Sequence, residues 1–220
     1  MPPTRKPVEA KSPPGFSRRT EELRSELRII SPDLLATRSG SIYTHLGIGS
    51  GEFHLQLYEE AITGAFPDLK FYSALGDELS EFQQLLLLYY FATADGSPLS
   101  EKYVSFADLP GGRMYAQAFQ GYTGNEVTKK FGDNIKAFKI ACAHVNGQPI
   151  NIADGAYIFQ VLPRISVLIV YWLGEDEFPS SCKILFDAAS THYVPIDACA
   201  IIGSNLAHRI IQSDLATQNT

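Results

Sequence analysis

The chain has 220 residues, of which 45% are hydrophobic and 19% are charged, as in an ordinary soluble globular protein. Its net charge is −6, but residues 1–19 carry five basic residues and one acidic residue, so the remainder has a net charge of −10. An acidic body repels a phosphate backbone, and no apolar run approaches the roughly 20 residues that cross a bilayer. The composition therefore excludes nucleic acid as a partner of the folded part and predicts no membrane span.

The cysteines are few and widely spaced. Cys142, Cys182 and Cys199 form no CxxC pair, and an odd number without a framework argues against a disulfide-stapled secreted protein. The spacing also excludes a self-contained zinc ribbon or a four-cysteine iron–sulphur site. We therefore expect a reducing compartment such as the cytoplasm. Cys182, which lies beside a loop, is the only candidate for a reactive cysteine.

The start of the chain differs from the rest. Five prolines fall within the first 14 residues, and proline interrupts both helices and strand ladders. We therefore expect residues 1–19 to be a disordered basic leader. Because such a start also resembles an organellar transit peptide, the stroma of an organelle is the alternative location. Residues 20–212 are expected to form a single α+β domain, with a flexible tail over residues 213–220.

Two helices are predicted at the start of this domain. Residues 20–30 place Leu23 and Leu27 on one helical face, and Thr20 can serve as the N-cap. Residues 31–39 predict a second, shorter helix, with proline near its start and glycine after its end.

A β-hairpin is predicted over residues 42–58. From Phe53 to Leu57 apolar residues alternate with polar ones, as in a half-buried strand, and residues 42–48 can form the partner strand. The glycine-rich stretch Gly47–Gly51 between them resembles a cofactor loop, but such loops lead into a helix, and here a strand pattern follows. A hairpin turn is therefore favoured, because glycine supplies the positive φ angles that tight turns need.

The later elements begin with a strongly predicted helix after Ser80, where Gln83 completes a capping box. The elements expected next are a helix over 125–145 that breaks at Gly132, strands on either side of Pro163, a strand over 182–187 and a closing helix over 197–211. Strands cluster instead of alternating strictly with helices. The expected fold class is therefore α+β, with a mostly antiparallel sheet and helices packed on one face.

The candidate catalytic residues lie where a strand gives way to a helix. An apolar strand ends at Asp187, and a turn leads to His192. If the turn brings the two together, the carboxylate can orient the imidazole, and His192 can act as a general base. The structural alternative is that Asp187 accepts turn amides and that His192 packs within the turn.

The candidate ligand-binding residues are drawn from the neighbouring loops. Glu175 and Asp176 lie in the loop before the preceding strand and are expected to converge on the same end of the sheet. Arg113 follows two glycines and can supply a cation for an anionic ligand. Tyr193, next to His192, completes the set.

No metal site is expected. His45 and His54 lie on the two strands of the predicted hairpin and can be neighbours, but they lack a third ligand. No motif identifies a cofactor.

Several motifs of the second half resemble those of one known family. The sequence contains LPGGR at 109–113, LPR at 162–164, GEDEFP at 174–179 and FDAASTHYVP at 186–195. Taken together, these motifs resemble a prokaryotic family described as a domain of unknown function, with patterns Leu-Pro-Gly-Gly-Arg, Gly-Asp-Glu-x-Phe-Pro and Phe-Asp-Ala-x-x-x-His-Tyr-x-Pro. Some relatives resemble iron–sulphur or corrinoid accessory proteins that carry a cysteine-rich cluster domain, which the three cysteines here do not form.

The functional expectation has two parts. The first is a non-enzymatic accessory or binding protein for a small cofactor, a metal or a partner protein. The alternative is a small hydrolase or lyase that uses His192 as a general base oriented by Asp187.

Overall fold

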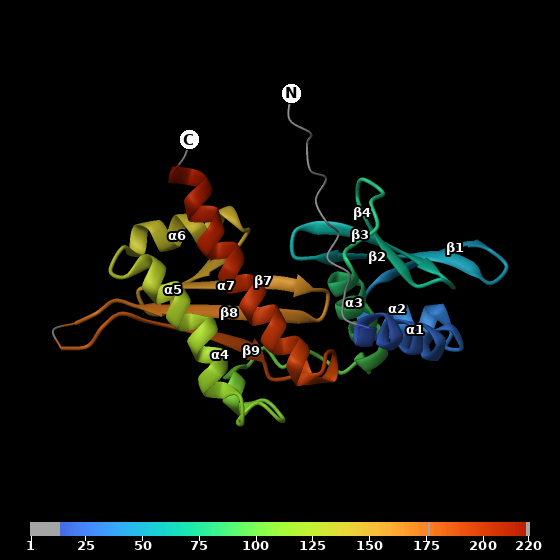
Figure 1. Cartoon of the computed structure of the whole chain (residues 1–220), viewed down its shortest axis with the longest axis horizontal. Helices are drawn as coiled ribbons and strands as arrows, with labels where there is room; N and C mark the ends of the chain where they lie inside the picture. The colour runs from blue at the N-terminus through green and yellow to red at the C-terminus, as the bar shows by residue number, and fades with distance from the viewer. Residues whose placement is uncertain (1–13, 176, 219–220) are drawn as a thin grey trace.

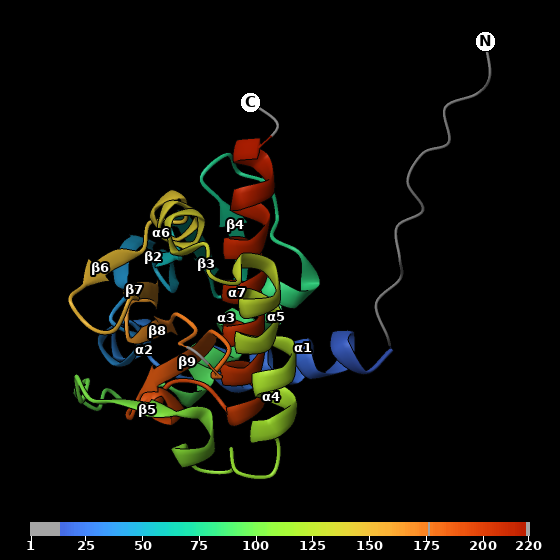
Figure 2. The same cartoon turned by 90° about the vertical axis from the view of Figure 1, so that its left-hand side faces the viewer.

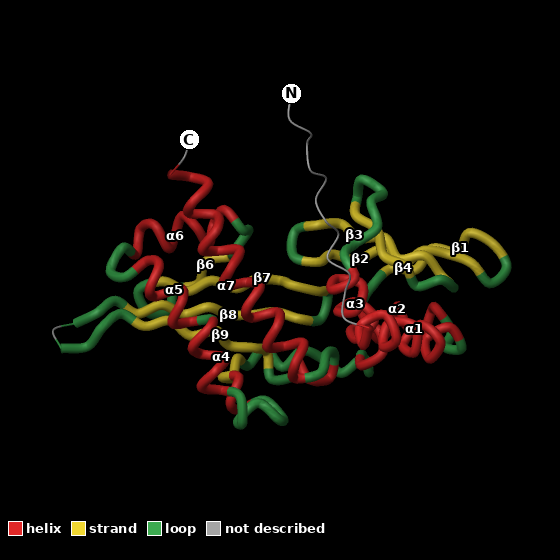
Figure 3. Tube along the Cα trace, in the orientation of Figure 1, coloured by secondary structure: helices red, strands yellow, loops and turns green. Residues whose placement is uncertain are grey.

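The computed structural model describes residues 14–175 and 177–218. Its elements, in chain order, are α1 (Pro14–Arg28), α2 (Pro32–Ser39), β1 (Ile42–Gly47), β2 (Ser50–Leu57), β3 (Glu60–Phe66), β4 (Lys70–Ser73), α3 (Glu81–Thr93), β5 (Tyr103–Ser105), η1 (Phe106–Asp108), α4 (Ala116–Tyr122), α5 (Gly124–Phe131), α6 (Ile135–His144), β6 (Gln148–Ile150), β7 (Gly155–Leu162), β8 (Ile165–Trp172), β9 (Ser181–Asp187), η2 (Ser190–His192) and α7 (Ile196–Gln218). The described residues form two antiparallel sheets, one of four strands in the order β1-β2-β3-β4 and one of five strands in the order β5-β9-β8-β7-β6 (Figures 1 and 3). The predicted α+β class is confirmed.

The five-stranded sheet carries helices on one face (Figure 2). Its central strand β8 is apolar except for Ser166, and alternate side chains face opposite sides. Val167, Ile169 and Tyr171 are buried in the main core beneath the helices. Leu168 and Val170 belong to a small separate cluster on the other face. The helix-covered sheet expected from the sequence corresponds to this part of the molecule.

The four-stranded sheet is an up-and-down meander that begins with the predicted hairpin. Gly49, at the tip between β1 and β2, has a φ of +72°. The rings of Phe53 and Phe71 pack on Phe91 of α3, with centroid distances of 4.8 and 5.7 Å. Gly64 on β3 makes room for this packing, because a Cβ there would lie 2.6 Å from the Phe71 ring.

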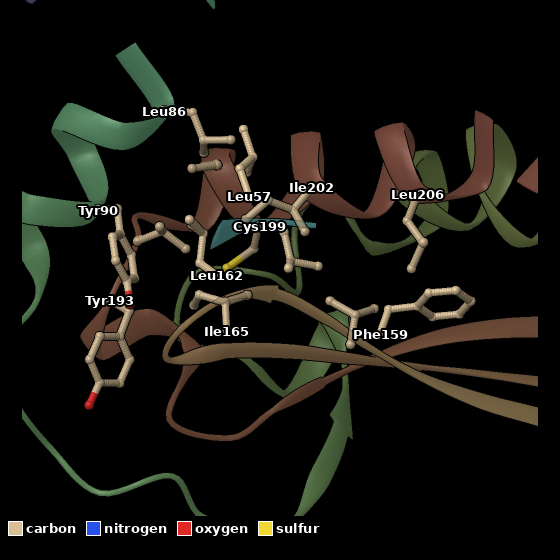
Figure 4. Close-up of a cluster of buried hydrophobic side chains, with 14 of the residues drawn as sticks. Leu57, Leu86, Tyr90, Phe159, Leu162, Ile165, Tyr193, Cys199, Ile202 and Leu206 are labelled. Carbon is tan, nitrogen blue, oxygen red and sulfur yellow. The ribbon is translucent and has the colours of Figure 1, made fainter. Parts of the chain in front are cut away.

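One continuous buried core joins the two sheets. Figure 4 shows Leu57 of β2, Leu86 of α3 and Ile202 of α7 in the same cluster. The turn after β2 is tied to the other sheet, because the Tyr58 N–H donates to the Val161 carbonyl at 2.7 Å. The Tyr58 hydroxyl donates to the Ile202 carbonyl at 3.3 Å. The β2–β3 turn is thereby tied both to β7 and to α7 at the junction of the sheets.

The capping signals of the middle helices are present. Ser80 and Gln83 form the predicted capping box at the start of α3. The helix predicted over 125–145 is two helices, α5 and α6, which separate at Gly132, where φ is +50°. The Asn134 side chain caps α6. The predicted break at this glycine is confirmed.

The first helix begins earlier than expected. Helix α1 starts at Pro14, so Thr20 lies inside it and does not cap it. The extra turns are compatible with the sequence, because proline fits the first turn of a helix and Arg19 pairs with Glu22 at 3.3 Å. The rest of the expected leader, residues 1–13, lies outside the described residues.

The last helix ends later than expected. Helix α7 continues to Gln218, so most of the expected flexible tail is helical, and residues 219–220 lie outside the described part. The extension is held by an ion pair of 2.9 Å between Lys130 of α5 and Asp214 of α7. Among the described helices, none combines the length and apolar character needed to cross a membrane.

Candidate functional site

Asp187 is a buried structural acceptor. It ends β9, and only 1% of its surface is exposed. One carboxylate oxygen accepts from the Ser100 N–H at 3.1 Å, from the Ser100 hydroxyl at 2.9 Å and from the Ala189 N–H at 2.8 Å. The other accepts from the Glu101 N–H at 2.7 Å. These bonds fix the loop before β5 and the turn after β9, as in the structural alternative of the sequence analysis.

His192 has a carboxylate partner, but that partner is Asp95. The imidazole Nδ1 lies 2.7 Å from Asp95 Oδ2 and 3.2 Å from Ser97 Oγ. The pair forms because Gly96, with a φ of +85°, turns the chain after α3 toward the η2 turn. The hydrogen bond from His192 is the largest of the effects that lower the pKa of Asp95, to about 2. The predicted pair of Asp187 and His192 is therefore not formed.

The acidic loop and Asp187 occupy opposite ends of one strand. Glu175 lies in the loop before β9, where its N–H donates to the Phe178 carbonyl at 3.0 Å. Asp187 is the last residue of β9, about 20 Å away at the usual rise of a strand. The expected convergence of this loop on Asp187 is wrong, because the strand separates them (Figure 1). Asp176 lies outside the described residues.

The remaining predicted ligand-binding residues also lie apart. Tyr193 is fully buried, its ring lies 6.2 Å from that of Tyr90, and its hydroxyl donates to the Ser97 carbonyl. Tyr193 therefore supports the fold and is covered by protein, whereas Arg113 is exposed in the turn before α4. The structure brings neither residue into a common hollow with Asp187.

The histidines and cysteines form no cluster suited to a metal. Within the described residues, no group of three or more His, Cys, Asp or Glu side chains is placed to hold a metal ion. His54 lies opposite Ile42 in the hairpin, and His45 instead contacts Asp33 at 3.1 Å. Cys182 is buried, and burial raises its thiol pKa, so the structure contradicts the expectation of a reactive cysteine.

An apolar hollow of about 150 Å³ lies between α3 and α7. Its wall on α3 is formed by Phe82, Leu85, Leu86 and Tyr89. The opposite wall is formed by Asp197, Ala198 and Ile201 of α7 and by Pro195, which precedes that helix. The α3 residues recur at helical spacing, beside the leucines that face the core. The run of four leucines in α3 predicts a helix buried on nearly all sides, so the sequence gives no sign of the stripe that stays partly open.

A second hollow of about 210 Å³ adjoins the first and shares Phe82 and Leu86 with it. Its other lining residues are Leu57, Tyr58, Glu60, Gln83, Asn205, His208 and Arg209. The guanidinium of Arg209 lies 4.5 Å from the centre of the Tyr58 ring and forms an ion pair with Glu59. Its Nε is buried and has no hydrogen-bond partner within the described residues. We call the two hollows together the α3–α7 groove.

Fold and groove define an α+β protein with two antiparallel sheets and an apolar groove between two helices. The model of the family described as "Domain of unknown function (DUF3786)" matches residues 47–209, and the chain belongs to this family. The match includes all of α3 and the part of α7 that lines the groove. Membership of a family of unknown function, which the motifs predict, is confirmed. No curated protein and no solved structure matches the chain.

Proposed function

We propose that this chain is a binding protein whose α3–α7 groove takes an apolar segment of a partner protein. The observation that carries the proposal is the pair of adjoining hollows between α3 and α7, the first lined almost entirely by apolar side chains. The proposal keeps the binding role expected from the sequence. It moves the site from the end of β9 to the groove.

The size and order of the two hollows favour a segment of a protein chain, and not a small molecule, as the bound ligand. Each hollow is small, and only together do they reach the lower end of the ~300–1,000 Å³ typical of small-molecule pockets. They follow one another along α7 and share two residues of α3, which suits side chains that enter in sequence from one face of a helix or extended segment.

The charged residues that line the groove indicate which charge the bound segment carries beside its apolar face. Asp197 lines the first hollow and Glu60 lines the second, within a body of net negative charge. A partner segment with basic residues beside its apolar face complements these carboxylates.

The experiment is an anisotropy titration of a fluorescent, helix-forming peptide of leucine and lysine against the wild type and variants. Leu85→Glu and Ile201→Glu place a carboxylate in the apolar wall and are expected to weaken binding by about tenfold or more. Ile140→Glu changes the net charge equally at an exposed position of α6 and is the matched control. It should bind like the wild type.

Three outcomes contradict the proposal. Equal binding by all four proteins would mean that the groove does not hold the peptide, and equally tighter binding by all three variants would mean that net charge alone drives binding. Saturable binding of the neutral dye Nile red at the same wall, without peptide binding, would assign the groove to a small apolar molecule.

A second candidate function rests on the contact between Asp95 and His192. A carboxylate bound to Nδ1 fixes the tautomer and leaves Nε2 as a base, which is the arrangement of a hydrolase or lyase. In this version Asp95 takes the orienting role expected of Asp187. Hydrolysis of a p-nitrophenyl ester should then fall in both His192→Gln and Asp95→Asn, and rates equal to that of the wild type would exclude it.

A further inference from the structure

The outer edge of the four-stranded sheet at β4 is closed. The Gln84 side chain accepts from the Phe71 N–H at 3.0 Å and donates to the Phe71 carbonyl at 2.8 Å. The Leu79 N–H also donates to this carbonyl at 3.0 Å. A side-chain amide and the following loop therefore occupy the backbone groups that another strand would need.

The five-stranded sheet prevents pairing at its edges in another way, through short edge strands. Its edge strands β5 and β6 have only three residues each. Short edge strands offer too few consecutive backbone groups for stable pairing with another chain.

The edge at β1 has neither form of protection. It has six residues, none of which is proline, lysine, arginine or an acid. Ile42 and Leu46 are 69% and 64% exposed. Within the described part of the chain, the backbone of β1 pairs with β2 alone. An uncharged, exposed edge of this length is a template for another strand.

We propose that β1 pairs antiparallel with β1 of a second copy of this chain, across a twofold axis at Thr44. The two meanders then form one continuous sheet of eight strands. In this register Thr44 lies opposite Thr44 of the second copy, and Ile42 lies opposite its Leu46. The β1–β2 register is regular from Ile42 to His45 and shifts at Leu46, so the irregularity lies at the outer Ile42–Leu46 pairs and outside the three central pairs of the proposed dimer.

The sequence of β1 is self-complementary in this register. Both Ile42–Leu46 contacts cover apolar side chains that are exposed in the single chain. Tyr43 lies opposite His45, so no like charges meet directly. Glu52, the β2 neighbour of Thr44, lies about three strand spacings, or ~14 Å, from its counterpart, which exceeds the ~8 Å Debye length at physiological salt. The pairing uses a surface separate from the α3–α7 groove and does not depend on the proposed function.

Disulfide trapping tests the axis. Opposed residues of an antiparallel pair have Cα atoms about 4.5–5.5 Å apart, within the range of a disulfide. Thr44→Cys should form a covalent dimer under mild oxidation, and Gln56→Cys, also exposed but on the interior strand β2, should not. The native thiols do not interfere because Cys142, Cys182 and Cys199 are buried. Equal trapping of both variants would overturn the proposal.

Light scattering with a charge swap tests the register. The wild type should have twice the 24.2 kDa mass of one chain, and Ile42→Lys should shift the protein toward the monomer. Adding Leu46→Glu places each new lysine opposite a new glutamate of the second copy, and the dimer should return. A monomeric wild type, or failure of the double variant to recover the dimer, would overturn the proposal.

Discussion

The Nδ1 atom of His192 lies 2.7 Å from Oδ2 of Asp95, across 97 positions of sequence. Asp95 follows the end of α3, and His192 precedes the start of α7. The contact therefore joins the two helices that line the groove, at the end where the chain leaves one and enters the other. It positions the walls of the proposed binding site whether or not the imidazole also acts as a base.

The pair predicts a pH dependence of stability. The pKa of Asp95 is about 2 in the folded protein, below its ordinary value of 3.8, mainly because of the hydrogen bond from His192. A depressed carboxyl pKa stabilises the fold fully above the unfolded value and loses this contribution as the pH falls toward the folded value. The free energy of unfolding should therefore differ most between the wild type and Asp95→Asn near pH 5, and the difference should shrink toward pH 2. Urea unfolding measures it, and a difference independent of pH in this window would refute the assignment.

Removal of the Asp187 carboxylate should lower the free energy of unfolding more than removal of the Asp95 carboxylate does. Asp187→Ala leaves the backbone donors of Ser100, Glu101 and Ala189 without their acceptor and should lower the free energy of unfolding by about 2–4 kcal/mol. Asp187→Asn keeps one acceptor oxygen and should lie between this variant and the wild type. Asp154, which is exposed and accepts from one amide, is the matched control, and Asp154→Ala should cost less than about 1 kcal/mol. Equal losses at both positions in urea unfolding would contradict the structural role.

Local signals identify the elements whose determinants lie close together in sequence. The capping box of Ser80 and Gln83 marks the start of α3 because both residues belong to one helical turn. Alternation marks β2, and Gly132 marks the break between α5 and α6. Strands β3 and β4 lack such a signal, since small residues such as Gly64 replace the β-branched run that typifies a strand. The reason for Gly64 is the Phe71 ring on the neighbouring strand, which only the fold places there.

The candidate site could be predicted only in part, because its residues come from distant positions that only the fold brings together. The sequence spacing of five residues favours Asp187 as the partner of His192, whereas the carboxylate that contacts His192 is Asp95, in the loop after α3. Asp95 gives a local signal only as part of an Asp-Gly helix end. The groove is absent from the sequence reading because its two walls, represented by Leu85 and Ile201, come from helices at distant positions in the chain.

Replacing Gly203 of α7 by alanine should lower stability, although the same change in a helix ordinarily raises it. Gly→Ala inside a helix ordinarily stabilises it, but a Cβ at Gly203 would lie 2.7 Å from the Phe119 ring, which is stacked on Phe106. Gly203→Ala should therefore destabilise the protein by about 1–3 kcal/mol. Gly121→Ala in α4 meets no atom within 4 Å and should be neutral or stabilising by up to about 1 kcal/mol. Thermal unfolding of the two variants would contradict this packing if both moved the midpoint in the same direction.

We expect all three cysteine thiols to be unreactive toward thiol reagents in the folded protein. Cys142, Cys182 and Cys199 are buried, and burial raises the thiol pKa of each, to about 12 for Cys199. The native protein should therefore react very slowly with Ellman's reagent, and all three thiols should react after unfolding in urea. Rapid reaction of a single native thiol would show that one of these residues is accessible.

The most direct test of the groove is a methyl NMR titration of the wild type with the leucine–lysine peptide. The binding account predicts saturable shifts of the Leu85, Leu86 and Ile201 methyl groups, which line the first hollow. The exposed methyl groups of Ile29 and Ile140 should stay unchanged, because they lie outside it. Shifts confined to those exposed residues, with the groove methyl groups unmoved at saturation, would contradict the account.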